Sequence, residues 1–177
     1  MRRALITCAD KTNLETLCET LSSVGCELIS TGGTKSFLQD KGFQVTDISE
    51  VTGNPEAFRG RVKTLSFSLA ASLLYDPKKD SEEAKSLGVT PIDLVVCNFY
   101  PFSKVSEEEK DQQALMEYVD IGGPTSVRSA AKNFMRVASL CRVLDYPRVI
   151  EELKASGGKI SYETRRELMR IAFNVTA

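Results

Sequence analysis

The segment PIDLVVCNFYPF at residues 91–102 is the part of this sequence that most constrains the fold. Its apolar residues follow one another almost without interruption, instead of alternating with polar residues as in a strand that has one face in water. A continuous run of this kind is typical of a strand that is buried on both faces in a parallel sheet. It therefore predicts a central strand in a sheet that helices cover on both sides.

Shorter strand and helix patterns alternate along the chain before this run. The predicted strands are residues 4–8, 26–30 and 43–49, and the predicted helices between them are residues 10–25 and 31–42. Leu14, Leu17 and Leu21 show the helical spacing of apolar residues in the first of these helices. Strands that alternate with helices favour parallel pairing, because the chain must cross the sheet between neighbouring strands. The predicted fold class is α/β, a three-layer α/β/α architecture with a mainly parallel central sheet.

The rest of the chain continues a single domain, which we expect to span residues 1–177. Residues 50–91 are less regular, with a long loop predicted at 52–64 and a polar connection with a short helix at 76–88. Beyond the central strand we expect helices at 111–119, 124–133, 145–158 and 161–177, a turn at 120–123 and a last strand at 136–143. The charged run SEEEKD at residues 106–111 is interpreted as a solvated loop or the start of a helix.

Charge and residue content exclude several classes of function. A formal charge of −1 and a pI near 5.7 provide no overall field that would hold a nucleic acid or an anionic membrane. The first apolar run is too short for a secretory signal or a membrane span, so we expect a cytoplasmic protein. The five cysteines are scattered and never spaced C-x-x-C, which argues against a disulfide framework or a zinc site. Histidine is absent, so any catalysis must use lysine, carboxylates, tyrosine, threonine or backbone groups.

Two motifs at strand ends are suited to binding a phosphate. STGGTK at residues 30–35 places Gly32 and Gly33 at the start of a helix, where backbone N–H groups and the Thr34 hydroxyl can cradle an anion. TCADKTN at residues 7–13 lies at the same edge of the sheet, and Lys11 can add a charged hydrogen bond. The alternatives are a glycine turn that only joins strand to helix, and a surface lysine beside a helix cap.

Three further motifs carry polar side chains that a reaction can use. Arg61 and Lys63 are two residues apart, so in an extended loop they point to opposite sides, and the alternative is an exposed basic loop. Polar residues also close the central strand, and a carboxylate precedes a helix that carries a lysine about three turns further on. That carboxylate and lysine can also be a helix cap and a solvent-facing charge. Because most of these motifs fall at one edge of the predicted sheet, together they indicate a site for a phosphorylated small molecule.

The motifs DKTNL, STGGT, DISEVTGNPEAFRGRVKTL, VVCNFYPF, VDIGGPTSVRSAAKN and RRELMRIAF occur in an order that resembles a known family. It is the inosine monophosphate cyclohydrolase domain of the bifunctional purine-biosynthesis enzyme, in which a formyltransferase domain follows. The resemblance covers essentially the whole chain and implies a methylglyoxal-synthase-like fold and a homodimer. It also implies closure of 5-formamidoimidazole-4-carboxamide ribonucleotide to inosine monophosphate with loss of water, without metal or organic cofactor. We expect either a stand-alone cyclohydrolase or an excised domain, working with a separate or fused formyltransferase.

The resemblance also implies roles for individual residues, motif by motif. The implied substrate-binding residues are Lys11, Thr31, Gly32, Gly33, Thr34, Arg61, Thr64, Asn98, Ile121 and Gly122. The implied catalytic residues are Lys63, Tyr100, Asp120 and Lys132. The two lysines would polarise the formyl oxygen, and Asp120 would act as base or orient the carboxamide. Asn98 and Tyr100 would position the heterocycle.

At several positions the sequence departs from the family pattern. The family usually has histidines where this chain has Ser66, Ala70 and Phe134, while Phe67 replaces a proline and Ala9 replaces a serine. If those histidines only pack or bond loops, phenylalanine can replace them; if they help catalysis, this is a slower or inactive relative. The alternative function is a catalytically silent module that senses a nucleotide or phosphate, and a methylglyoxal synthase is a third, weaker alternative.

Overall fold

The computed structural model describes residues 1–100, 102, 106 and 111–177, and these form a five-stranded sheet between layers of helices. All strand pairs are parallel, and the strand order is β3-β2-β1-β4-β5. The strands are β1 (Arg3–Cys8), β2 (Glu27–Ser30), β3 (Val45–Asp47), β4 (Leu94–Asn98) and β5 (Ala138–Leu140). Every residue of β4 is buried, so the prediction of an internal strand covered on both faces is confirmed.

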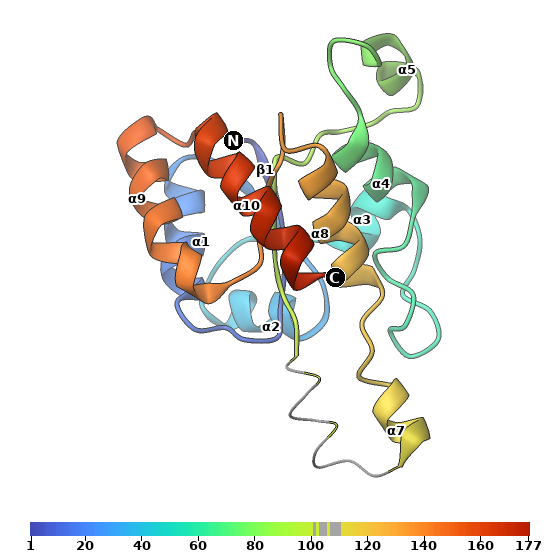
Figure 1. Cartoon of the computed structure of the whole chain (residues 1–177). Helices are drawn as coiled ribbons and strands as arrows, with labels where there is room; N and C mark the ends of the chain where they lie inside the picture. The colour runs from blue at the N-terminus through green and yellow to red at the C-terminus, as the bar shows by residue number, and fades with distance from the viewer. Residues whose placement is uncertain (101, 103–105, 107–110) are drawn as a thin grey trace.

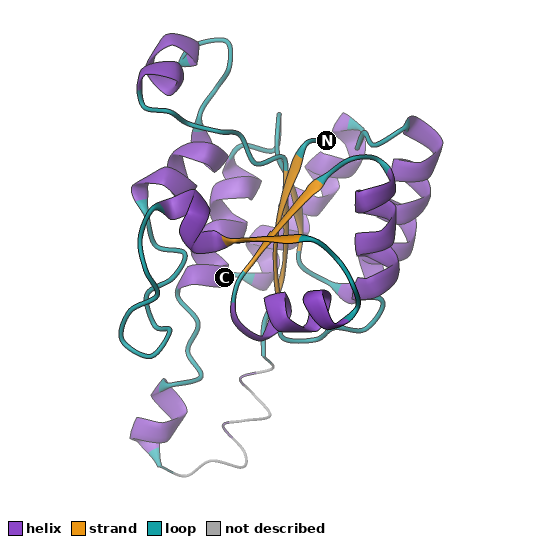
Figure 2. Cartoon of the chain, turned by 180° about the vertical axis from the view of Figure 1, so that it is seen from behind, coloured by secondary structure: helices purple, strands orange, loops and turns teal. Residues whose placement is uncertain are grey.

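Helices pack on both faces of the sheet, as the alternation predicts (Figures 1 and 2). The helices described are α1 (Leu14–Ser23), α2 (Gly32–Asp40), α3 (Ile48–Thr52), α4 (Phe67–Leu74), α5 (Ser81–Ser86), α7 (Gln112–Met116), α8 (Gly122–Lys132), α9 (Tyr146–Ser156) and α10 (Tyr162–Val175), with a 3-10 turn η1 (Val143–Asp145). In Figure 1, α1 and α9 lie on one side of the sheet, and α3, α4 and α8 lie on the other.

Alternate residues of β1 divide the core into these two layers. Ala4 and Ile6 are fully buried against α1 and α9, whereas Leu5 is fully buried against α4 and α8. The α10 helix contributes to both layers, with Leu168 in the first and Ile171 in the second. Because opposite sides of each strand face different helices, both sides must be apolar, which explains the continuous apolar runs in the sequence.

Two short helices occur where the sequence predicted other structure. The strand expected at residues 43–49 ends at Asp47, because Asp47 and Glu50 form a capping box that starts α3. The α4 helix lies in the segment expected to be irregular, and the Ser66 hydroxyl caps it by accepting a hydrogen bond from the Leu69 N–H. The turn expected at 120–123 is also shorter, because α8 begins at Gly122.

Among the described residues, no helix is long and apolar enough to cross a membrane. The same residues contain no group of three or more histidine, cysteine, aspartate or glutamate side chains that would hold a metal ion. The charged run predicted to be a loop or helix start lies mostly outside the described residues, since positions 107–110 belong to the part not described.

The five cysteines are free and buried in the core, which leads to a first prediction. Burial raises the pKa of Cys8 to about 11 and that of Cys18 to about 12, so neither thiol ionises near neutral pH. We expect Ellman's reagent at pH 8 to modify fewer than about one thiol per native chain within minutes, because the thiolate is the reactive form. Unfolding in denaturant should expose all five. Rapid modification of the native chain would contradict this placement of the cysteines.

Candidate functional site

The order of the strands creates a natural binding position at the carboxyl ends of β1 and β4. From β1 the chain passes to β2 on one side, while β4 pairs with β1 on the other side. In open parallel sheets, the crevice outside such a switch point is where ligands bind. Cys8 and Asn98 end the two strands and pair with each other in register. The motifs predicted to bind phosphate, which follow β1 and β2, therefore lie at this edge.

The Asn98 side chain is engaged by the protein itself rather than open to a ligand. Its Oδ1 accepts a hydrogen bond from the Asp10 N–H at 2.8 Å, and its Nδ2 donates to the Asp10 carbonyl at 2.7 Å. Asn98 is only 9% exposed. The backbone beyond β1 takes both ends of the amide, and the contact of Asn98 with the heterocycle stays a prediction.

The segment at residues 9–12, which we call the β1 loop, is held in a defined turn. The Asp10 carboxylate accepts a hydrogen bond from the Thr12 N–H at 2.8 Å. Hydrogen bonds from Thr12 lower the pKa of Asp10, so this exposed carboxylate is ionised at neutral pH. Lys11 is half-buried, and its Nζ lies 3.5 Å from the carbonyl oxygens of Cys8 and Ala9. These neutral partners leave the Lys11 charge available to an anion at this edge.

The start of α2 provides backbone donors beside the β1 loop. Helix geometry leaves the N–H groups of Gly32 and Gly33 without acceptors in the helix, and both glycines are exposed. The Thr34 hydroxyl, in contrast, both accepts from the Cys8 N–H and donates to the Cys8 carbonyl, each at 3.0 Å. The predicted contact of this hydroxyl with phosphate is therefore replaced by a tie to β1. That tie brings the N-terminal end of α2 next to Lys11.

Lys63 reaches the same glycine turn from the long loop. A Cβ atom built on Gly32 would lie 3.2 Å from Lys63 Nζ, so the ammonium sits directly against the turn. Lys63 Nζ is also 3.4 Å from a Glu56 carboxylate oxygen, and the Lys63 side chain is 27% exposed. Arg61 points outward instead, donating to the Phe58 carbonyl and lying 3.8 Å from Glu117. The opposite directions predicted for these two cations are thus observed, with Lys63 facing the turn.

Gly60 allows the long loop to fold back so that Lys63 and Glu56 approach each other. Its φ of +88° lies in the region that favours glycine, and a Cβ there would fall 2.6 Å from Lys63 Cε and 2.7 Å from Glu56 Oε1. An isolated bridge between Ala57 and Val62 closes this part of the loop. Neither Glu56 nor Asp10 was singled out from the sequence. The available signal for Glu56 was its place in the GNPEAFRGRVKT block.

The start of α8 joins this edge through Thr64. The Thr64 side chain occupies the space where a Cβ of Gly122 would be, so the residue after Lys63 packs directly on the first turn of α8. The Asp120 carboxylate accepts a hydrogen bond from the Gly123 N–H at 3.0 Å and lies close to Cys97. Asp120 thus has the alternative role of a helix cap, two residues before the Gly122 that contacts Thr64. Ile121, between Asp120 and Gly122, is 59% exposed.

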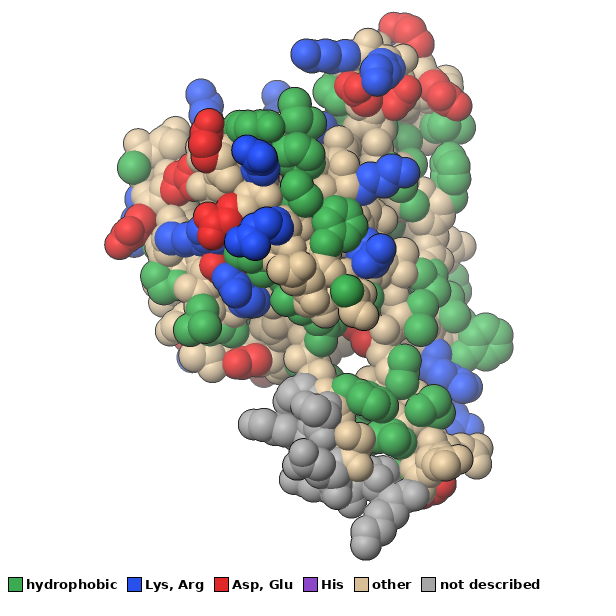
Figure 3. Space-filling view, in the orientation of Figure 1, with side chains coloured by type: hydrophobic (Ala, Val, Ile, Leu, Met, Phe, Trp, Pro, Cys, Tyr) green, Lys and Arg blue, Asp and Glu red, His purple; other side chains and the backbone are tan. Residues whose placement is uncertain are grey.

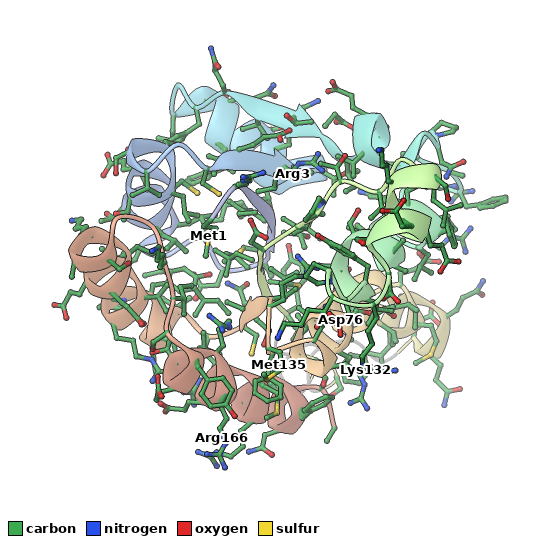
Figure 4. All side chains as sticks on the ribbon, turned by 90° about the horizontal axis from the view of Figure 1, so that it is seen from above. Met1, Arg3, Asp76, Lys132, Met135 and Arg166 are labelled. Atoms are coloured by element: carbon green, nitrogen blue, oxygen red, sulfur yellow. The ribbon has the colours of Figure 1, made fainter. Side chains whose placement is uncertain are left out.

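The remaining two predicted catalytic residues are Tyr100 and Lys132. Tyr100, two residues beyond β4, is 62% exposed. Lys132 ends α8, ten residues after Gly122, which places it about 15 Å away along the helix axis. The next residue, Asn133, donates to the carbonyls of Leu73 and Tyr75 at the far end of α4. Figure 4, which views the end where Met1 and Arg3 lie, shows Lys132 at its rim near Met135.

The residues that replace the expected histidines also have structural partners. Ser66 caps α4, and Phe67 beside it is 68% exposed. Phe134 stacks on Tyr162 of α10, with ring centroids 5.8 Å apart. Phe134 follows Lys132 at the amino-end edge of the sheet, so it is remote from Lys63 in the same chain.

Two hollows in the surface lie away from the cluster. A hollow of about 370 Å³ lies on α10, and a smaller one of about 200 Å³ lies between α3, α4 and residues 87–90. Neither is lined by Lys11, Lys63 or Asp120. The cluster combines half-buried cations with backbone donors, which suits a ligand that carries its own negative charge.

Comparisons with known proteins show which family this chain resembles. The family model described as "MGS-like domain" matches residues 13–125, and the model described as "AICARFT/IMPCHase bienzyme" matches residues 130–177. The bifunctional purine biosynthesis protein PurH of Elusimicrobium minutum (strain Pei191) is 44% identical over 181 residues, covering 100% of this chain and 35% of that protein. PurH of Aquifex aeolicus (strain VF5) is 44% identical over 177 residues, covering 99% and 35%.

A solved structure extends the similarity to three dimensions. The structure titled "Crystal structure of ForH" superposes with a TM-score of 0.86 at 34% identity, covering 99% of this chain and 93% of that one. The chain spans only 35% of the length of the two purine biosynthesis proteins. The family matches nevertheless run from residue 13 to residue 177 with a short gap, and of the cluster they leave out only the β1 loop. The chain therefore belongs to the MGS-like domain family and is a relative of the bifunctional purine biosynthesis proteins.

Proposed function

We propose that this chain is an inosine monophosphate cyclohydrolase, which closes 5-formamidoimidazole-4-carboxamide ribonucleotide to inosine monophosphate with loss of water. The observation that carries the proposal is the position of Lys63, whose Nζ lies against the Gly32 turn at the carboxyl edge of the sheet. This cation thus adjoins the backbone donors that suit a phosphate. The purine biosynthesis relatives support the same reaction.

The chemistry requires placement and charge stabilisation more than a strong base. The carboxamide nitrogen is a poor nucleophile that must attack the formyl carbon of the same molecule, and negative charge develops on the formyl oxygen. The N–H groups of Gly32 and Gly33 with Lys11 would bind the phosphate. Lys63 would stabilise the developing oxyanion, and Asp120 would orient the carboxamide and take its proton, giving up its cap to do so.

We propose a homodimer, with Lys132 supplied to each site by the second copy. Exposed apolar side chains cluster on α7 and on the segment that joins it to α8, namely Met116, Tyr118, Val119 and Ile121. In Figure 1 this segment projects away from the body of the molecule, and Figure 3 shows hydrophobic side chains gathered there. A patch of this kind favours burial against a partner. The distance along α8 supports the second copy as the source of Lys132, since its own site lies at the opposite edge.

The biochemical setting follows from the same proposal. We infer a cytoplasmic enzyme that receives its formylated substrate from a formyltransferase, either separate or fused, as in the bifunctional relatives. A net charge of −1 favours a small phosphorylated ligand over nucleic acid or an anionic membrane as partner.

The direct test is turnover by the purified, folded chain. The formylated ribonucleotide is added and the absorbance of the purine product is followed, with product identity checked by mass. We expect saturable turnover that scales with enzyme concentration and disappears on unfolding. A folded dimer that shows no turnover above the spontaneous rate would overturn the proposal.

A second candidate is a catalytically silent module that binds the nucleotide. The observation that favours it is the engagement of Thr34, Asn98 and Asp120 by the protein's own backbone. It predicts that inosine monophosphate binds in calorimetry while the formylated substrate is not converted. Detectable turnover in the assay above would exclude this alternative.

A further inference from the structure

A buried polar cluster lies directly beneath the β1 loop and is not used by the proposed reaction. Tyr146, the first residue of α9, is completely buried. Its Oη lies 3.3 Å from Asn98 Nδ2 and 3.6 Å from Cys8 Sγ. Burial raises the pKa of Tyr146, so the hydroxyl keeps its proton and can donate as well as accept. A fully buried tyrosine in a core of aliphatic residues requires such partners for its hydroxyl.

Tyr146 supports the Asn98 amide in the orientation that the Asp10 backbone selects. One N–H of Asn98 Nδ2 is donated to the Asp10 carbonyl, and the other is directed at Tyr146 Oη. This leaves Oδ1 as the atom that accepts from the Asp10 N–H. With the amide turned over, Oδ1 would face the Asp10 carbonyl and Nδ2 would face the Asp10 N–H, so both bonds would be lost. The Asp10 backbone thus selects the orientation, and the Tyr146 hydroxyl holds the amide in it by accepting a third hydrogen bond.

The β1 loop in turn places Lys11. Its backbone beyond Cys8 is held at Asp10 by the two bonds from Asn98, and the Asp10 carboxylate then fixes the turn at Thr12. Lys11 lies between these two fixed points. A loop that is ordered before the ligand arrives loses less conformational entropy on binding, and affinity rises accordingly.

We propose that Tyr146 is a positioning residue for the phosphate monoester of the ligand, acting through Asn98 on the β1 loop. This rests on the proposed function only in the choice of ligand, a ribonucleoside monophosphate. Tyr146 does not touch the ligand, and its effect is transmitted by the orientation of one amide. The residue was not singled out from the sequence, where it reads only as part of an amphipathic helix.

The test is Tyr146→Phe, which keeps the ring in the core and removes the hydroxyl alone. Binding is measured by calorimetry with two probes, inosine monophosphate and ribose 5-phosphate. We expect Kd to rise about 5- to 10-fold for both, because the loss is at the phosphate that they share. In turnover, KM should rise by a similar factor while kcat falls less than about threefold. The control is Tyr75→Phe, on a ring that stacks with Arg136 beside Asn133, remote from the β1 loop; it should leave both Kd values unchanged.

A double-mutant cycle separates positioning from simple loss of stability. Asn98→Ala removes the group through which Tyr146 acts and should weaken both probes at least as strongly as Tyr146→Phe. Added to Asn98→Ala, the Tyr146→Phe change should alter Kd by less than about twofold, since the path is already broken. Melting temperatures are recorded for all variants, and binding is measured well below them. Unchanged Kd in folded Tyr146→Phe, or effects that multiply in the double variant, would overturn the inference.

The binding data decide the role of Tyr146, and the turnover assay decides the proposed function separately. If the wild-type chain binds both probes but does not convert the formylated substrate, the cyclohydrolase proposal fails while the role of Tyr146 is still decided by the binding data. If the wild-type chain binds neither probe, both proposals fail.

Discussion

Replacement of Lys63 by alanine should lower kcat about 100- to 1,000-fold while raising the Kd of inosine monophosphate only a few-fold. Lys63 Nζ sits against the Gly32 turn and would meet the formyl oxygen as its charge develops, so its contribution is larger in the transition state than in the bound ground state. The measurement combines steady-state turnover of the formylated ribonucleotide with calorimetry of the product. Lys63→Arg should recover part of kcat, because it restores the charge with a different shape.

The matched control comes from the same loop. Arg59, like Lys63, follows the GNPEAF segment, and its side chain is exposed. Arg59→Ala removes this cation, which is not among the residues that form the cluster. Its kcat should stay within about twofold of wild type, as is usual for an exposed charge. If Lys63→Ala changes only KM, or if Arg59→Ala loses as much activity, the role assigned to Lys63 is wrong.

The second large effect concerns Lys132 and the second copy of the chain. As a homodimer, Lys132→Ala should lose about 100-fold in kcat, since it removes a cation from the developing charge. A heterodimer of one Lys63→Ala chain and one Lys132→Ala chain should regain about half of wild-type activity, because one of its two sites then holds both lysines. Co-expression with two different affinity tags and tandem purification provides this heterodimer for the turnover assay.

A different pairing serves as the control. Thr64 packs on Gly122, so Asp120 and Lys63 belong to the same edge of one chain. We therefore expect no recovery of activity in a heterodimer of one Lys63→Ala chain and one Asp120→Ala chain, because each of its two sites lacks one of these residues. Recovery of one functional site of two would mean that Lys63 and Asp120 come from different chains. Inactivity of the Lys63/Lys132 heterodimer would show instead that Lys132 acts within its own chain. Full activity of the Lys132→Ala homodimer would remove Lys132 from the mechanism.

The sequence predicted the architecture well where burial alone determines structure. The continuous apolar run ending in Asn98 had to be an internal strand, and the parallel sheet followed from the alternation of strands and helices. It was less successful where a short polar contact starts a helix. The caps at Asp47 and Ser66 depend on single side chains, and α4 has too few turns to show a clear helical period.

For the site, the sequence identified the residues but not all of their contacts. The family resemblance and the strand ends placed Lys11, Gly32 and Lys63 at one edge, and in the structure Lys63 lies against Gly32 while Lys11 lies at the end of the neighbouring strand β1. Thr34 and Asn98 also lie there, but their side chains bind the backbone of Cys8 and Asp10. A polar side chain binds the protein instead of a ligand when backbone groups that lack partners lie within its reach. Those backbone groups belong to segments far away in the sequence.

The sequence by itself therefore determined the fold class, the edge at which the polar motifs gather and the family to which the chain belongs, because apolar periodicity and motif order are local properties. Only the tertiary structure decided that Lys132 stands at the opposite edge from Lys63, since the length and direction of α8 separate residues that one motif appears to unite. It alone also placed the Tyr146 hydroxyl under Asn98, where strand and helix meet across 48 residues of chain.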